Sequence, residues 1–172
     1  VSKVNGNIVD TLMPSLSSFE LSLGFMIGGA LRGIFVATGV LVVIFPFLSL
    51  FPVNFFTLYF YITMGSITFS LMGILVGVFC KKFDQMSAVN NFFIAPLSFL
   101  SGTFYSVSKL PGPFDVISFF NPVFWLMDGV RFGALGEAES NIFLGCLGIM
   151  SVNLILFLMV WKWFSVGYFL KD

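Results

Sequence analysis

Apolar residues fill most of this chain, and short polar or proline-containing breaks divide it into segments. Four of the apolar runs are long enough to cross a bilayer as a helix, which takes about 20 residues. We place these spans at about residues 33–53, 55–80, 85–107 and 142–162. The pattern therefore predicts an all-α, polytopic membrane helix bundle with residues 21–172 as its transmembrane domain.

The stretch at residues 108–140 is apolar but broken twice, at the Leu-Pro-Gly-Pro of residues 110–113 and at Asn121-Pro122. Neither apolar piece is long enough to span, so we predict a re-entrant helical hairpin in one face of the membrane. Asn121 suits a helix N-cap and Pro122 the first helical position. Asp128 and Arg131 follow at a helical i, i+3 spacing that allows them to pair.

Residues 1–20 are the longest stretch with regularly placed polar residues and predict a short amphipathic helix outside the bilayer. Pro14 ends that helix, and Ser17 or Ser18 caps the next one with Glu20 in its first turn. This pattern fits both a plain juxtamembrane loop and a docking helix for a soluble partner.

Three polar features lie within or beside the predicted spans. Arg32 is interpreted as an anchor at the cytoplasmic interface, with a buried arginine that pairs helices or binds substrate as the alternative. Asn90 and Asn91 either line a polar path or hydrogen-bond between helices. Pro96 predicts a kink in the third span, with nearby serines satisfying freed carbonyls. Ser140 or Asn141 is expected to cap the last span.

The basic residues orient the bundle. If residues 1–20 are cytoplasmic, four spans return the C-terminus to the cytoplasm, and the hairpin lies on the outer face. Most basic residues then lie on or near the inner side, as the positive-inside rule requires. These are Lys3, Arg32, Lys81, Lys82, Lys162 and Lys171, with only Lys109 and Arg131 outside. We interpret Lys81, Lys82 and Lys162, like Arg32, as cytoplasmic-interface anchors.

Composition supports the membrane assignment and excludes much chemistry. The chain is 58% hydrophobic and 9% charged, with a mean hydropathy of +1.04 and zero net charge, so it gives no sign of a nucleic-acid partner. It has no histidine, and its two cysteines lack a metal-ligand spacing, so we expect neither a metal site nor a catalytic dyad. There is no GxxxxGK[ST] phosphate loop. We therefore expect no enzyme and no cofactor in this chain.

Two runs carry a resemblance to a known family. NIVDTLMPSLSSFELSLGFMIGGALRG resembles the cytoplasmic segment and following helix of type-2 ABC exporter permeases. NFFIAPLSFLSGTFYSVSKLP, followed by NPVFWLMDGVRFGALGE, resembles the C-terminal signature of the same family. The resemblance implies six spans per subunit, of which this chain holds the last four. It also implies that the chain is a fragment, which its valine start suggested.

The resemblance further implies a permease subunit without ATPase activity, paired with a second permease copy in a bacterial inner membrane. A separate ABC ATPase would bind the ATP and Mg²⁺. By likeness, the segment coupling to that ATPase contains Asn7, Ile8, Asp10, Leu12, Pro14 and Glu20. The outer hairpin contains Pro111, Asn121, Pro122, Asp128 and Arg131. The alternatives are a channel or secondary carrier that needs no ATPase, or a structural membrane-assembly protein.

Overall fold

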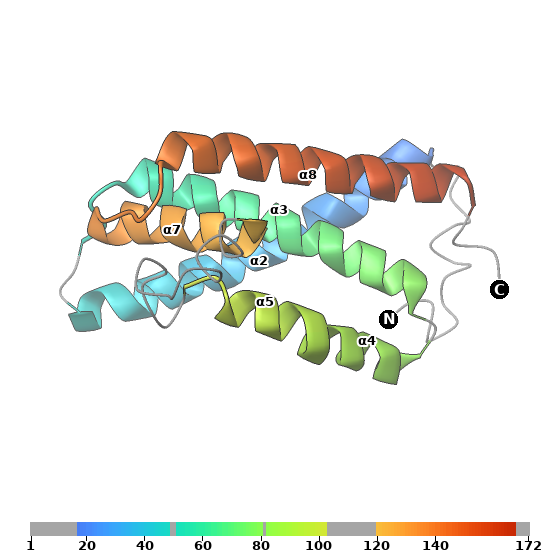
Figure 1. Cartoon of the computed structure of the whole chain (residues 1–172), viewed down its shortest axis with the longest axis horizontal. Coiled ribbons are helices and arrows are strands. Elements are labelled where there is room, and N and C mark those ends of the chain that lie inside the picture. The colour runs from blue at the N-terminus through green and yellow to red at the C-terminus, as the bar shows by residue number, and fades with distance from the viewer. Residues whose placement is uncertain (1–16, 49–50, 81, 103–119, 168–172) are drawn as a thin grey trace.

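The computed structural model describes residues 17–48, 51–80, 82–102 and 120–167, in which all regular secondary structure is helical (Figure 1). The helices are α2 (Ser18–Leu48), α3 (Phe55–Phe79), α4 (Phe83–Val89), the π-helical turn η1 (Asn90–Ile94), α5 (Ala95–Phe99), α7 (Pro122–Leu135) and α8 (Ile142–Ser165). Within this described part, α2, α3 and α8 are long and apolar enough to cross a membrane. The predicted all-α polytopic membrane bundle is confirmed.

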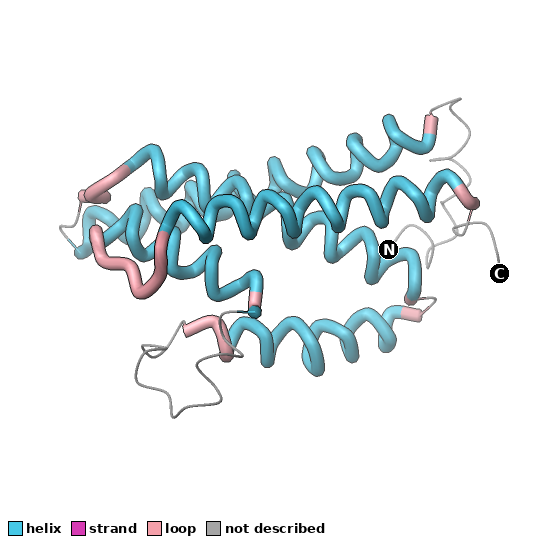
Figure 2. Tube along the Cα trace, turned by 45° about the horizontal axis from the view of Figure 1, so that its top comes forward, coloured by secondary structure: helices cyan, strands magenta, loops and turns pink. Residues whose placement is uncertain are grey.

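The three long helices pack against one another, and α7 lies against α3 and α8 at one end of the bundle. Helices α4 and α5, joined through η1, form an arm along the bundle that meets α7 through α5 (Figures 1 and 2). We call the end that holds the start of α2 the Glu20 end, and the end that holds α7 the hairpin end. Aromatic contacts fix the Glu20 end: Phe19 lies 5.7 Å from Phe157, and Phe79 lies 4.4 Å from Trp163, between ring centroids.

The helix starts agree with the sequence. Ser17 and Glu20 form a reciprocal cap, in which the Ser17 N–H donates to the Glu20 carboxylate at 2.8 Å and the Glu20 N–H donates to Ser17 Oγ at 3.3 Å. Asn121 caps α7 through Val123 N–H, with Pro122 at the first helical position. Asn141 caps α8, so of the two predicted cap residues, Ser140 and Asn141, the asparagine forms the cap.

Helix α2 differs from the predicted first span. It begins at Ser18 and continues through Arg32 without a break, whereas we placed the span at residues 33–53 with residues 21–31 below or along the surface. The flanking residues are apolar, so one arginine does not interrupt the helical pattern, and the helix ends at Leu48. Pro46 lies inside its last turn.

The predicted third span, at residues 85–107, is described only to residue 102, where it forms the arm of α4, η1 and α5 and is not one of the described helices long enough to cross a membrane. Its irregular backbone is a π-helical turn directly before α5, whose first turn contains Pro96. Proline has no N–H to donate, and a widened turn is one way to accommodate it within a helix. Ser98 Oγ donates to the Ile94 carbonyl at 2.9 Å, as expected for a serine beside a helix irregularity.

Close contact between α7 and α3 depends on two glycines. A Cβ atom on Gly129 would lie 2.3 Å from Tyr61 Cδ1, and one on Gly133 would lie 2.6 Å from the Leu58 backbone nitrogen. Leu58 and Tyr61 are both buried. The glycines therefore let the short helix α7 pack closely on α3, Gly129 against the Tyr61 ring and Gly133 against the Leu58 backbone.

Candidate functional site

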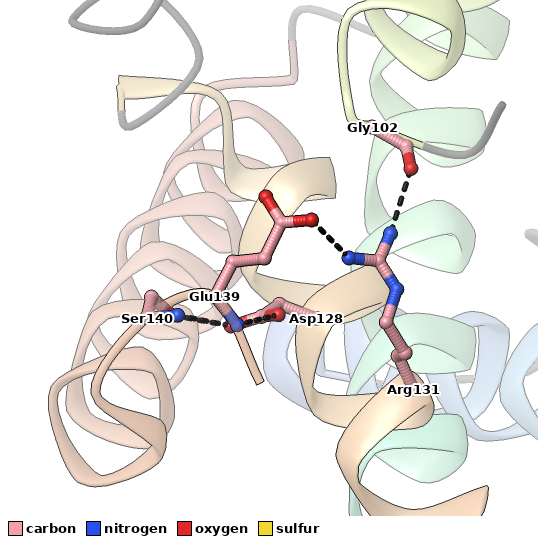
Figure 3. Close-up of polar contacts among 5 residues, drawn as sticks. All are labelled: Gly102, Asp128, Arg131, Glu139 and Ser140. Atoms are coloured by element: carbon pink, nitrogen blue, oxygen red, sulfur yellow. Dashed lines mark hydrogen bonds and ion pairs between the residues drawn. The ribbon is translucent and has the colours of Figure 1, made fainter. Parts of the chain in front are cut away.

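Asp128 is the buried centre of a polar cluster at the hairpin end (Figure 3). Its carboxylate accepts hydrogen bonds from the backbone N–H groups of Glu139 and Ser140, at 2.8 and 2.9 Å, and from the Ser140 hydroxyl at 2.5 Å. Hydrogen bonds to a carboxylate are stronger than those between neutral groups. Asp128 therefore fixes the turn that joins α7 to the last span.

Arg131 extends this cluster to the end of the arm. Its guanidinium donates to Glu139 Oε1 at 2.7 Å and to the carbonyl oxygen of Gly102 at 2.7 Å (Figure 3). The side chains of Arg131 and Glu139 are 25% and 18% exposed, so this ion pair is partly shielded from solvent. One side chain thus connects three segments: α7, the turn after it, and the residues that follow α5.

The predicted pairing of Asp128 with Arg131 is wrong. Asp128 is satisfied by the three donors of residues 139 and 140, whereas Arg131 pairs with the Glu139 carboxylate. Helical spacing brings two side chains near each other, but the turn after α7 supplies better-placed partners for both. Glu139 and Gly102 were missed as partners because nothing local in the sequence links them to Arg131.

Asn121 makes a second connection between α7 and the arm. Its amide group donates to the Leu97 carbonyl of α5 at 2.7 Å, while its side-chain oxygen caps α7. The last carbonyl groups of a helix have no partner within it. Asn121 therefore satisfies one end of α5 and starts α7 with the same side chain.

A hydrogen-bonded pair also lies inside the bundle. Thr68 Oγ1 on α3 lies 2.8 Å from Asn153 Oδ1 on α8, and the Asn153 amide donates to the Met64 carbonyl at 3.2 Å. Both side chains are buried. Neither residue was predicted to form such a contact, although a lone asparagine within an apolar span is the signal for one. The side chains of Asn90 and Asn91, by contrast, form no hydrogen bond within the described residues, so their proposed roles stay predictions.

A cavity of about 760 Å³ lies among α2, α3, α5 and α7. Among the described residues its wall is mainly apolar, and Arg32 is the charged residue in it. Four of the lining residues carry hydroxyl groups: Tyr61, Ser66, Ser70 and Ser98. This combination of an apolar wall and one cation suits an amphipathic ligand rather than an ion alone.

Arg32 lies at the level of the middle of the bundle. On either side of it along α2, Gly29 packs against Ser70 and Gly33 packs against Ser66, and both serines belong to the central part of α3. Ser70 Oγ also donates to the Met26 carbonyl at 3.0 Å. This level lies away from both ends of α2, but the Arg32 side chain is exposed rather than buried, so both roles stay predictions.

The remaining predicted residues are placed as follows. Glu20 caps α2, and Lys82 and Lys162 lie at the Glu20 end, at the start of α4 and in the last turn of α8. The other coupling residues and two further predicted positions lie outside the described residues. These are Asn7, Ile8, Asp10, Leu12, Pro14, Lys81 and Pro111. In the described part of the chain, no group of His, Cys, Asp and Glu side chains is arranged to hold a metal ion.

Comparison with known proteins identifies the family of this chain. Residues 1–135 match the family model described as ABC-2 type transporter. The chain is 29% identical over 172 residues to "Inner membrane transport permease YadH" of Escherichia coli K12, covering 99% of this chain and 67% of that protein. It is 27% identical over 94 residues to "Nodulation protein J" of Rhizobium leguminosarum bv. viciae, covering 55% of this chain and 36% of that protein. No solved structure gives a significant match. The chain belongs to the ABC-2 type transporter family, as a membrane-spanning permease.

Proposed function

We propose that this chain forms part of the translocation path of an ATP-driven exporter in a bacterial inner membrane. The observation that carries the proposal is the family match over residues 1–135 in a chain without a phosphate-binding loop. On this proposal the energy for transport comes from another protein. The partner is a separate ABC ATPase, which binds ATP and Mg²⁺, and a second permease copy completes the path.

Helix α2 supports a mechanical link between the ATPase and the path. It starts at the Ser17–Glu20 cap, next to the predicted coupling segment, and its 31 residues extend for about 46 Å. The cavity wall includes Gly29, Arg32 and Gly33 of the same helix. A displacement of the coupling segment therefore moves one wall of the cavity, because no break in α2 absorbs it before Pro46.

The contacts at the hairpin end fit a role for α7 at the exit of the translocation path. Asn121 and Arg131 tie α7 to the arm, and Asp128 ties it to the turn before α8. A re-entrant helix held at three points can act as a fixed rim past which cargo leaves. The predicted orientation puts the Glu20 end inside and the hairpin end outside, so exported cargo would leave past the hairpin.

The coupling claim is tested by co-purifying the full-length permease with its candidate ATPase and measuring ATP turnover in lipid. We expect the double substitution Asp10→Asn and Glu20→Gln to weaken both association and turnover. Glutamine can still complete the cap at Ser17, so this variant removes charge while the helix start is kept. Glu137→Gln, an exposed acidic residue at the opposite end, is the matched control and should behave as wild type. Unchanged association and turnover in the double variant would remove these residues from the coupling segment.

A further inference from the structure

We propose that Arg32 and the cavity around it bind an amphipathic anion, with the anionic head group at the guanidinium and the apolar tail along the cavity wall. Naming this ligand as cargo rests on the proposed function, whereas the binding itself does not. The proposal assigns a chemical class, a negatively charged head group on a hydrocarbon tail, to the 760 Å³ cavity.

The first observation behind this proposal is the depth of Arg32 in the bilayer. Ser66 and Ser70, which pack against the glycines on either side of it, lie near the middle of a helix that runs from Phe55 to Phe79. The apolar core of a bilayer is about 30 Å thick, so its centre lies about 15 Å from either surface. That is further than one arginine side chain extends. Arg32 therefore cannot reach either surface from this level. Its side chain is exposed where it borders the cavity, so its charge needs a partner at that level.

The second observation is that Arg32 has no counter-ion among the described residues. In the described segments, Arg32 takes part in no hydrogen bond or ion pair, and the cavity wall contains no carboxylate. Two acidic side chains of the hairpin end have other partners: Asp128 binds the turn at residues 139 and 140, and Glu139 binds Arg131. A charge at mid-bilayer costs about 3 kcal/mol or more unless it is paired, and such residues commonly mark substrate paths.

The third observation concerns the hydroxyl-bearing residues of the cavity wall. Tyr61 donates to the Ile142 carbonyl, Ser70 to the Met26 carbonyl and Ser98 to the Ile94 carbonyl, so their protons are committed. Ser66, which packs against Gly33 directly after Arg32, forms no hydrogen bond to another described residue. A guanidinium and one uncommitted hydroxyl form a donor set suited to the oxygens of a phosphate or carboxylate.

The remaining wall of the cavity explains the requirement for a tail. Beyond these polar groups it is lined by aliphatic and aromatic side chains, including Val36, Ile62, Phe69, Leu126 and Val130. These surfaces gain little from a hydrated inorganic ion but favour a hydrocarbon chain. The site therefore requires both parts of the ligand together.

The experiment measures binding of radiolabelled dodecyl phosphate to the full-length permease in phosphatidylcholine nanodiscs, without ATPase or nucleotide. We expect saturable binding that unlabelled dodecyl phosphate displaces and that inorganic phosphate or dodecylphosphocholine displaces poorly. Arg32→Gln should weaken binding about tenfold or more, and Arg32→Lys should weaken it less. Lys162→Gln removes the same charge at the Glu20 end and should leave binding unchanged.

A second variant tests the tail independently of the charge. Val36 is 57% exposed and borders the cavity, so Val36→Trp fills it without crowding the core. This variant should also weaken dodecyl phosphate binding while it elutes as a folded species by size exclusion. Wild-type affinity in both Arg32→Gln and Val36→Trp would overturn the proposal, as would equal displacement by dodecylphosphocholine. Because no ATPase is present, such a failure leaves the proposed function intact, and loss of ATPase coupling leaves this site intact.

Discussion

The carboxylate of Asp128 on α7 accepts hydrogen bonds from both the backbone N–H and the hydroxyl of Ser140, directly before the last span begins. These contacts attach the short helix α7 to the turn before α8 through a buried carboxylate. Helix α7 therefore lies in a defined place although its 14 residues are too few to span a bilayer.

Replacing Asp128 tests this attachment. Asp128→Asn keeps the shape of the side chain but replaces one acceptor oxygen with an NH₂ group, which opposes the donors of residues 139 and 140. We expect the free energy of unfolding to fall by about 1–3 kcal/mol, the cost of leaving buried donors unsatisfied. Thermal unfolding in detergent measures this, with Glu137→Gln as the exposed control. Equal midpoints for the two variants would show that the contact does not hold the turn.

The ion pair between Arg131 and Glu139 joins α7 to the same turn at 2.7 Å. Because both side chains are partly exposed, we expect a coupling free energy of only about 1 kcal/mol. A double-mutant cycle of Arg131→Gln and Glu139→Gln gives this value from unfolding data. Strictly additive effects would mean that Arg131 contributes through the Gly102 carbonyl alone.

Gly133 tests the close approach of α7 to α3. A Cβ atom there would lie 2.6 Å from backbone atoms of Leu58, which cannot move aside as a side chain can. We expect Gly133→Ala to lower the free energy of unfolding by about 1–3 kcal/mol. Gly24→Ala on α2 is the matched control, since its Cβ would meet nothing within 4 Å and alanine favours helix. If both alanines are tolerated alike, the two helices do not pack this closely.

The fourth prediction concerns the buried hydrogen bond between Thr68 on α3 and Asn153 on α8. Thr68→Val removes the hydroxyl that contacts Asn153 while the Asn153 amide keeps the Met64 carbonyl. Interhelical hydrogen bonds in membranes average about 0.6 kcal/mol, so we expect a loss of that order. Thr63→Val on the same helix is the comparison, because its hydroxyl bonds only within α3, to the Tyr59 carbonyl. A loss no larger than that of Thr63→Val would mean that the buried contact adds nothing.

Local patterns predicted the helix starts well. The helix starts follow the capping rules: Ser17 with Glu20 at α2, Asn121 with Pro122 at α7, and Asn141 at α8. These signals depend on residues within one turn of each other. The helical bundle was likewise evident from the length of the apolar runs.

Contacts between distant segments could not be predicted in the same way. Arg131 binds Gly102 and Glu139 because three segments meet at the hairpin end, and no spacing rule connects them. The depth of Arg32 depends on which part of α3 lies beside it, which only the packing of Gly29 and Gly33 reveals. The sequence offered two roles for this arginine, an interface anchor and a buried residue, and both stay predictions.

The most direct test of the central claim is the rate of ATP hydrolysis by proteoliposomes that contain the full-length permease alone, the candidate ATPase alone, or both. The account predicts no hydrolysis by the permease, because its sequence carries no phosphate-binding loop, and a rate for the pair above that of the ATPase alone. Hydrolysis by the permease on its own, or a rate for the pair no higher than that of the ATPase, would contradict it.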